Sequence, residues 1–239
     1  MGPQGNTRLG RIEKFAKLAS LAVFALCVFI SRVQADTPTG NVVSGSVEIF
    51  DRNNKRLEDH SNMVVFVEGA KLAQNSTTQA NIPKISHKGR QFSPRVLPIN
   101  KGGSVDFFND DSIYHNVFSL ARAKPFDLGI YPEGTSKIVS FERTGLVKLY
   151  CNIHPNMVSN VLVLNNPFFA TTDADGAYEI QGLPDGAFVI RVWSEFGAQE
   201  SRAVDLNGGG RYEENFSVSK TRVFVQHKNK FGMPYREKY

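Results

Sequence analysis

The sequence predicts an all-β fold made of a Greek-key β-sandwich followed by a small second β-sandwich. No segment after residue 35 has a sustained helical period with capping residues, and short apolar segments alternate instead at period two. Turns containing Gly and Pro separate these segments at the spacing typical of sandwiches and barrels. The chain after residue 35, 204 of the 239 residues, exceeds one average domain and suits two modest ones.

The first sandwich is expected over residues 43–165. Val43–Phe50 is predicted as its first strand because alternate apolar residues there share one face. Pro94 and Pro98 confine the extended segment Phe92–Ile99 to a sheet edge or a bend, since proline has no backbone N–H to donate. The other strands predicted in this region are Met63–Glu68, Ser104–Asn109, Ser136–Phe141, Leu146–Tyr150 and Val158–Leu164.

The second sandwich is expected over residues 168–219, after a boundary at 165–167. Two Asp-Gly pairs, Asp175-Gly176 and Asp185-Gly186, lie between alternating segments and indicate β-hairpins. The first pair also imitates the start of a calcium-binding loop. The later acidic ligands do not follow at the required spacing, so a hairpin turn is favoured.

Both ends of the chain carry basic segments. Residues 1–35 are expected to be a secretory signal peptide cleaved after Ala35, with basic residues followed by the apolar run Leu18–Ile30. This run of 13 residues is short for a membrane span, which needs about 20, although an uncleaved anchor is the alternative. Residues 220–239 are expected to be a basic C-terminal tail, in which Val223 and Val225 add at most one strand.

The predicted signal peptide accounts for most of the positive charge. It contains five of the 28 Lys and Arg and one of the 23 Asp and Glu. The chain beyond it therefore has 23 basic and 22 acidic residues, a net charge of +1, and nucleic-acid binding has little support. An exported chain without a further apolar run is expected in the periplasm, with no membrane span in the mature protein.

The single cysteine that remains after export is the strongest functional signal. Cys27 leaves with the signal peptide, and a lone Cys in an exported protein must be intermolecular, reactive or metal-bound. Cys151, His154 and Met157 follow one another at intervals of three residues, and His115 lies upstream. Two His, one Cys and a weak axial Met are the ligands of a blue-copper electron-transfer centre, so we expect one type 1 copper ion.

These residues also fit other kinds of site. Cys151 could be a nucleophile with His154 as its base, but His115 and Met157 would then have no role. A structural zinc site is the other alternative, although a thioether suits copper better. His60, His87 and His227 are not expected to be ligands. Asn116, beside His115, is expected to hydrogen-bond across to the ligand loop.

The motif Cys-x-x-His-x-x-Met after an upstream His-Asn resembles the cupredoxins, and its short loop is most like that of amicyanin. The resemblance covers residues 43–165 and extends to plastocyanin-like bacterial proteins, some labelled methylamine-utilisation proteins. It implies copper ligands at His115, Cys151, His154 and Met157. The chain departs from amicyanin in a polar insert, 71–91, and in its second domain. That domain resembles carboxypeptidase regulatory-like, transthyretin-like modules in its Asp-Gly and Leu-Pro patterns.

The expected function is therefore one-electron transfer between protein redox partners, without substrate turnover and without enzymatic activity. A copper storage or delivery module is the first alternative. The second is a structural or interaction module in which copper only stabilises the fold.

Overall fold

The computed structural model describes residues 40–69, 81–197, 199–222 and 226–235, all of which belong to one unit, Pro38–Tyr239. These residues form strands, turns and loops without a helix, which confirms the predicted all-β class. None of them provides a helix long and apolar enough to cross a membrane. The predicted signal peptide, with its Cys27, and the possible strand at Val223 and Val225 lie outside the described residues.

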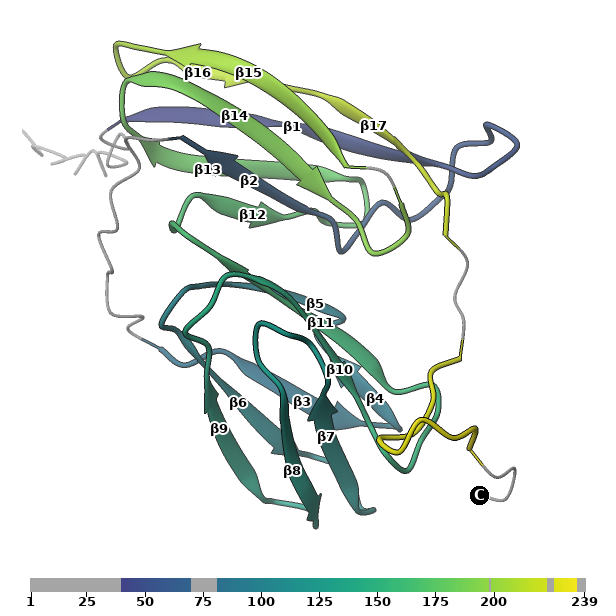
Figure 1. Ribbon diagram of the computed structural model, residues 1–239. Coiled ribbons are helices and arrows are strands. Elements are labelled where there is room, and N and C mark those ends of the chain that lie inside the picture. The colour runs from purple at the N-terminus through teal and green to yellow at the C-terminus, as the bar shows by residue number, and fades with distance from the viewer. Residues whose placement is uncertain (1–39, 70–80, 198, 223–225, 236–239) are drawn as a thin grey trace, which may run out of the picture. The chain divides into compact units, whose positions relative to one another are not determined.

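Residues 81–165 form one β-sandwich, which we call the inserted sandwich (Figure 1). Its strands are β3 (Lys84–Lys88), β4 (Gln91–Ser93), β5 (Val96–Asn100), β6 (Ser104–Asn109), β7 (His115–Ser119), β8 (Phe126–Tyr131), β9 (Ser136–Ser140), β10 (Gly145–Tyr150) and β11 (Val158–Leu164). One sheet has the order β5-β11-β10-β7-β8, and the other has the order β4-β3-β6-β9. The pairs β5–β11 and β3–β6 are parallel, whereas the other pairs are antiparallel.

Alternating side chains from both sheets build the core of this sandwich. Val105 and Phe107 of β6 face Val147 and Leu149 of β10 within one buried cluster. Strand β11 is buried along its whole length because both of its faces are covered. Val161 and Val163 join this core, whereas Leu162 and Leu164 join a cluster with Trp193, as expected for a strand whose side chains alternate between faces.

The remaining strands form a second β-sandwich, which we call the flanking sandwich (Figure 1). They are β1 (Asn41–Phe50), β2 (Val64–Glu68), β12 (Phe169–Thr171), β13 (Ala177–Leu183), β14 (Gly186–Trp193), β15 (Glu200–Leu206), β16 (Arg211–Glu213) and β17 (Phe216–Ser219). One sheet has the order β13-β1-β16, with β17 also paired to β1, and the other has the order β12-β2-β14-β15. Their facing side chains form a separate apolar core.

The strand pairing corrects the boundaries expected from the sequence. Val43–Phe50 and Met63–Glu68 were assigned to the first sandwich, 43–165. In the structure, β1 pairs with β13, β16 and β17, and β2 pairs with β12 and β14. The chain therefore begins the flanking sandwich, forms the inserted sandwich and returns. Alternation shows that a segment is a strand, but it does not select the partner strand.

Two local predictions also change. The expected polar insert, 71–91, contains β3 and the first residue of β4, and its residues 71–80 lie outside the described residues. Asp175-Gly176 lies at a tight turn and Asp185-Gly186 at a bend, but each connects strands in different sheets and closes no hairpin. Gly176 has a φ of 85°, and a Cβ there would lie 2.3 Å from the Val47 carbonyl oxygen, so the turn requires glycine. The prediction that Phe92–Ile99 is an edge segment is confirmed, since β5 ends its sheet.

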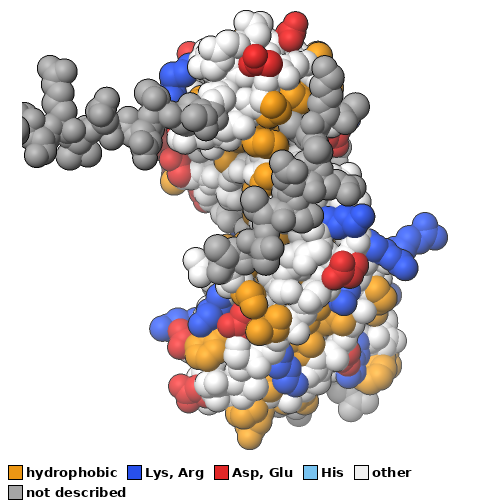
Figure 2. Space-filling view, turned by 90° about the vertical axis from the view of Figure 1, so that its left-hand side faces the viewer, with side chains coloured by type: hydrophobic (Ala, Val, Ile, Leu, Met, Phe, Trp, Pro, Cys, Tyr) orange, Lys and Arg blue, Asp and Glu red, His pale blue; other side chains and the backbone are white. Residues whose placement is uncertain are grey.

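The surface drawn in Figure 2 carries basic and acidic side chains close together, with hydrophobic side chains between them. This mixture agrees with the near-neutral charge of the chain beyond residue 35. It does not resemble the single-sign field that binds nucleic acid.

Candidate metal centre

The ligand loop, residues 151–157, connects β10 to β11. Tyr150 and Val158 form the last pair of this antiparallel ladder. The Cys151 N–H donates to the Met157 carbonyl over 3.2 Å, and the Met157 N–H donates to the His154 carbonyl over 3.2 Å. The backbone of the loop therefore closes on itself, and its three expected ligands lie at its start, middle and end.

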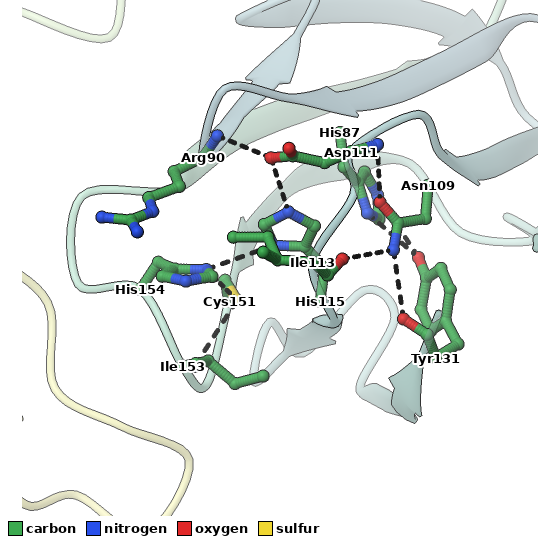
Figure 3. Close-up of polar contacts among 10 residues, drawn as sticks. All are labelled: His87, Arg90, Asn109, Asp111, Ile113, His115, Tyr131, Cys151, Ile153 and His154. Atoms are coloured by element: carbon green, nitrogen blue, oxygen red, sulfur yellow. Dashed lines mark hydrogen bonds and ion pairs between the residues drawn. The ribbon is translucent and has the colours of Figure 1, made fainter. Parts of the chain in front are cut away.

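His115 reaches the same place from the neighbouring strand, as the first residue of β7 (Figure 3). Its Nδ1 atom lies 3.1 Å from Nδ1 of His154, and Sγ of Cys151 lies 3.7 Å from that same nitrogen. The donor atoms of these three residues all lie within 4.8 Å of one another. A distant histidine and a local Cys-x-x-His pair thus present two imidazole nitrogens and one sulfur to a common point.

The burial of Cys151 favours a metal ligand over a nucleophile. Its side chain is fully buried, and burial raises the pKa of the thiol. Reactive cysteines instead have a lowered pKa and are accessible. A bound cation holds a buried thiolate in its charged form, and the Ile153 N–H, 3.4 Å from the sulfur, adds a hydrogen bond. The donor set and its surroundings therefore fit a soft cation such as copper.

His154 is only partly buried. Burial, followed by the charges of His115 and Arg90, lowers the pKa of His154 to about 4. Its imidazole is therefore neutral at neutral pH, which is the form that binds metals. His154 also lines a hollow of about 780 Å³ with Arg90, Pro155 and Tyr235, so the ligand loop borders a recess at the surface.

Asp111 holds the ring of His115 from its other side. Its carboxylate lies 3.0 Å from Nε2 of His115 and accepts the Arg90 N–H at 3.0 Å (Figure 3). The hydrogen bond from Arg90 is the main reason that the pKa of Asp111 is lowered. A carboxylate bonded to Nε2 favours the tautomer whose Nδ1 is free to bind a metal. From the sequence, Asp110-Asp111 is expected to be a solvated turn that tunes the electrostatic field near His115.

The expected hydrogen bond from Asn116 to the ligand loop is confirmed. Its side-chain oxygen accepts the Asn152 N–H over 3.2 Å. Its amide nitrogen donates to Asp127 over 2.7 Å and to the Gly129 carbonyl over 2.9 Å. The residue after His115 is therefore bonded to the residue after Cys151.

Met157, the expected axial ligand, is fully buried in the same core cluster as Cys151. The structure places it at the end of the ligand loop, directly before β11. Its axial role remains a prediction.

The sequence missed the environment of His87. This residue is fully buried in β3, and its ring lies 5.6 Å from that of His115 and 5.5 Å from that of Tyr131, between ring centroids. Burial, then the charge of His115, lowers the pKa of His87 to about 3. It does not belong to the His-Cys-His cluster found among the described residues. In the sequence, Ile85 and His87 alternate with the polar residues of β3. This alternation was the signal that could have placed His87 in the core.

The other histidines differ in their surroundings. His60 is buried in the flanking sandwich, where its Nδ1 accepts the Ile49 N–H over 3.0 Å, whereas its Nε2 is buried without a hydrogen-bond partner among the described residues. His227 was expected to be a surface or satisfied residue rather than a ligand, and its ring lies against that of Tyr150, directly before Cys151. Residues 220–239, which include His227, were expected to be a tail, and no sequence pattern indicated this contact.

No protein-family model and no curated protein matches the chain. Solved structures do show similarity. A purple cupredoxin from Nitrosopumilus maritimus is 30% identical over 34% of this chain and 99% of its own, with a TM-score of 0.32. The copper-containing nitrite reductase NirK from Thermus scotoductus SA-01 is 24% identical over 36% of this chain and 23% of its own, with a TM-score of 0.34. A reduced Cu(I) form of an amicyanin mutant is 16% identical over 42% of this chain and 98% of its own, with a TM-score of 0.34.

Proposed function

We propose that this chain is an exported type 1 copper protein of the cupredoxin family, which carries single electrons between redox proteins in the periplasm. The observation that carries the proposal is the convergence of Nδ1 of His115, Nδ1 of His154 and Sγ of Cys151 on one buried point. Two imidazoles and one thiolate are the trigonal ligand set of blue-copper proteins.

Each residue has a distinct task in this proposal. Copper bound there supplies a one-electron couple. His115, Cys151 and His154 would hold it through two imidazole nitrogens and a thiolate, and Met157 would add a weakly bound thioether sulfur. Asp111 and Asn116 keep the ligands in place, which limits rearrangement when the charge of the site changes. His154 lies at the surface hollow, so its ring edge is the proposed exit for electrons.

The proposal assigns no catalytic residue. Cys151 is too buried to attack a substrate, and His154 is assigned to the metal rather than to general-base chemistry. The partners are therefore proposed to be proteins that exchange electrons, rather than small molecules that are transformed. The proposed location rests on the signal peptide expected at 1–35.

The test is an absorption spectrum of the full chain after Cu(II) is added, followed by repeated reduction and oxidation. An intense visible band that bleaches and returns supports an electron carrier. A colourless Cu(II) complex would sink the type 1 assignment. A blue protein that loses copper quickly to a weak chelator supports storage or delivery instead. A preference for Zn²⁺ in competition with Cu(I) supports a structural zinc site.

A further inference from the structure

Residues 226–235, which we call the C-terminal segment, lie against the ligand loop. The hydroxyl group of Tyr235 donates to the Cys151 carbonyl oxygen over 2.5 Å. The Lys230 N–H donates to the side-chain oxygen of Asn152 over 2.9 Å. Two consecutive loop residues, one of them the proposed thiolate ligand, are thus bonded to a segment about 80 positions further along the chain.

Aromatic contacts extend this interface to the strand before the loop. The ring of His227 lies 4.5 Å from that of Tyr150, between centroids, and 5.2 Å from that of Tyr235. Nδ1 of His227 is 3.3 Å from the Tyr235 hydroxyl oxygen. The C-terminal segment therefore contacts residues 150, 151 and 152, which deliver the cysteine to the site.

The hydrogen bonds close a circuit that includes both ligand-bearing elements. Asn152 donates its N–H to Asn116, Asn116 donates to one carboxylate oxygen of Asp127, and Nζ of Lys230 lies 2.5 Å from the other. Lys230 also donates its N–H back to Asn152. Asn116 follows His115 directly. One lysine thus links the loop that carries Cys151 to the strand that carries His115.

The C-terminal segment is itself folded and attached. Asn229 accepts the Gly232 N–H and donates its own N–H to the Met233 carbonyl, each over 2.9 Å, so the segment contains a closed turn. Upstream, the N–H groups of Thr221 and Arg222 donate to the Phe196 carbonyl at 3.0 and 2.7 Å. This places the start of the connection on the flanking sandwich, after β17.

We propose that the C-terminal segment is a clamp that holds the ligand loop, with Tyr235 and Lys230 as positioning residues for the metal centre. The backbone of residues 151–157 has few bonds of its own, so contacts from outside determine how freely the loop opens. The effect of the clamp on copper binding rests on the proposed function, whereas its effect on the opening of the ligand loop concerns the metal-free protein alone.

The first test measures hydrogen exchange of residues 150–158 in the metal-free full chain. Tyr235→Phe and Lys230→Met are compared with Tyr212→Phe, which removes a hydroxyl bonded to Asn207 in the flanking sandwich, and with Lys148→Met at an exposed position of β10. Loss of one hydrogen bond is expected to speed exchange in residues 150–158 about fivefold in the two clamp variants. The controls keep the wild-type rate. Wild-type exchange in both clamp variants overturns the proposal.

The second test measures how fast a chelator removes copper from the same full-chain variants, together with their reduction potentials. Faster removal and a shifted potential are expected for Tyr235→Phe and Lys230→Met, while Lys230→Arg, which keeps the charge beside Asp127, restores wild-type values. Unchanged removal and potential in both clamp variants would show that the segment does not act on the metal. A wild-type protein without a blue Cu(II) complex defeats the proposed function, yet the hydrogen-exchange result still decides whether the clamp exists.

Discussion

The two sandwiches both bury histidine, but they use it differently. In the flanking sandwich, His60 accepts the Ile49 N–H, and its own carbonyl accepts the Thr172 hydroxyl over 2.7 Å. These bonds join segments of the backbone and satisfy buried polar groups. In the inserted sandwich, His115 directs its Nδ1 toward His154 instead. A buried histidine is therefore best interpreted from the groups that its ring nitrogens face. In the inserted sandwich, the ring nitrogen of His115 shares a common point with other atoms that can bind a metal.

The largest expected difference between the two regions concerns colour. Cys151→Ser should abolish the intense visible band of the Cu(II) protein, because a hydroxyl is a harder and poorer ligand than a thiolate. The measurement is the visible spectrum of the variant at saturating Cu(II), with Ser159→Ala in β11 as a control in the same sheet. A Cys151→Ser variant that stays blue would remove the basis of the metal assignment.

Copper should also stabilise the two sandwiches unequally. A ligand that binds only the native state raises the free energy of unfolding by about 4 kcal/mol when its concentration is a thousand times the dissociation constant. Because every proposed ligand lies in the inserted sandwich, hydrogen exchange of β7 and β10 should slow on copper binding, whereas that of β13 and β14 should not. Equal slowing in all four strands would mean that the sandwiches unfold together, which the shared cluster of Leu162, Leu164 and Trp193 permits.

The sequence pointed to a metal site because its signal is local, and the structure brings His115, Cys151 and His154 together. Cys151, His154 and Met157 lie within one loop, so their spacing alone indicated a metal site. Strand pairing is not local, and β1 has the same alternation whether it joins the inserted or the flanking sandwich. This is why the expected domain boundary at residue 43 differs from the observed sheets.

Contacts between distant segments account for what the sequence missed near the site. Tyr235 reaches Cys151 across 84 positions, and nothing in a basic, polar C-terminal stretch distinguishes a docked segment from a free tail. His87 was missed because its strand lies in a polar region, where only the buried Ile85 marks the inward face. Asp111 was visible in the sequence, but its bond to His115 depends on the turn before β7.

A matched pair of substitutions tests the different uses of histidine directly. His60→Leu should lower the free energy of unfolding by about 1–3 kcal/mol, because the buried Ile49 N–H loses its acceptor, and it should leave the colour unchanged. His115→Leu should remove the colour instead. Denaturant unfolding and visible spectra of both variants are the measurements. Loss of colour in His60→Leu would show that the flanking sandwich controls the metal centre more directly than its contacts indicate.

The smallest expected effect comes from Met157, and it tests how the four proposed ligands divide their roles. A thioether is a weak axial donor, so Met157→Leu should keep copper and colour while raising the reduction potential, since removing a donor favours Cu(I). Leucine is close to methionine in volume, so the fully buried position should tolerate it at a cost below about 1.5 kcal/mol. Voltammetry and copper analysis of the purified variant give both quantities. Loss of copper from Met157→Leu would show that the two imidazoles and the thiolate do not hold the metal by themselves, and that the convergence of His115, Cys151 and His154 describes only part of the site.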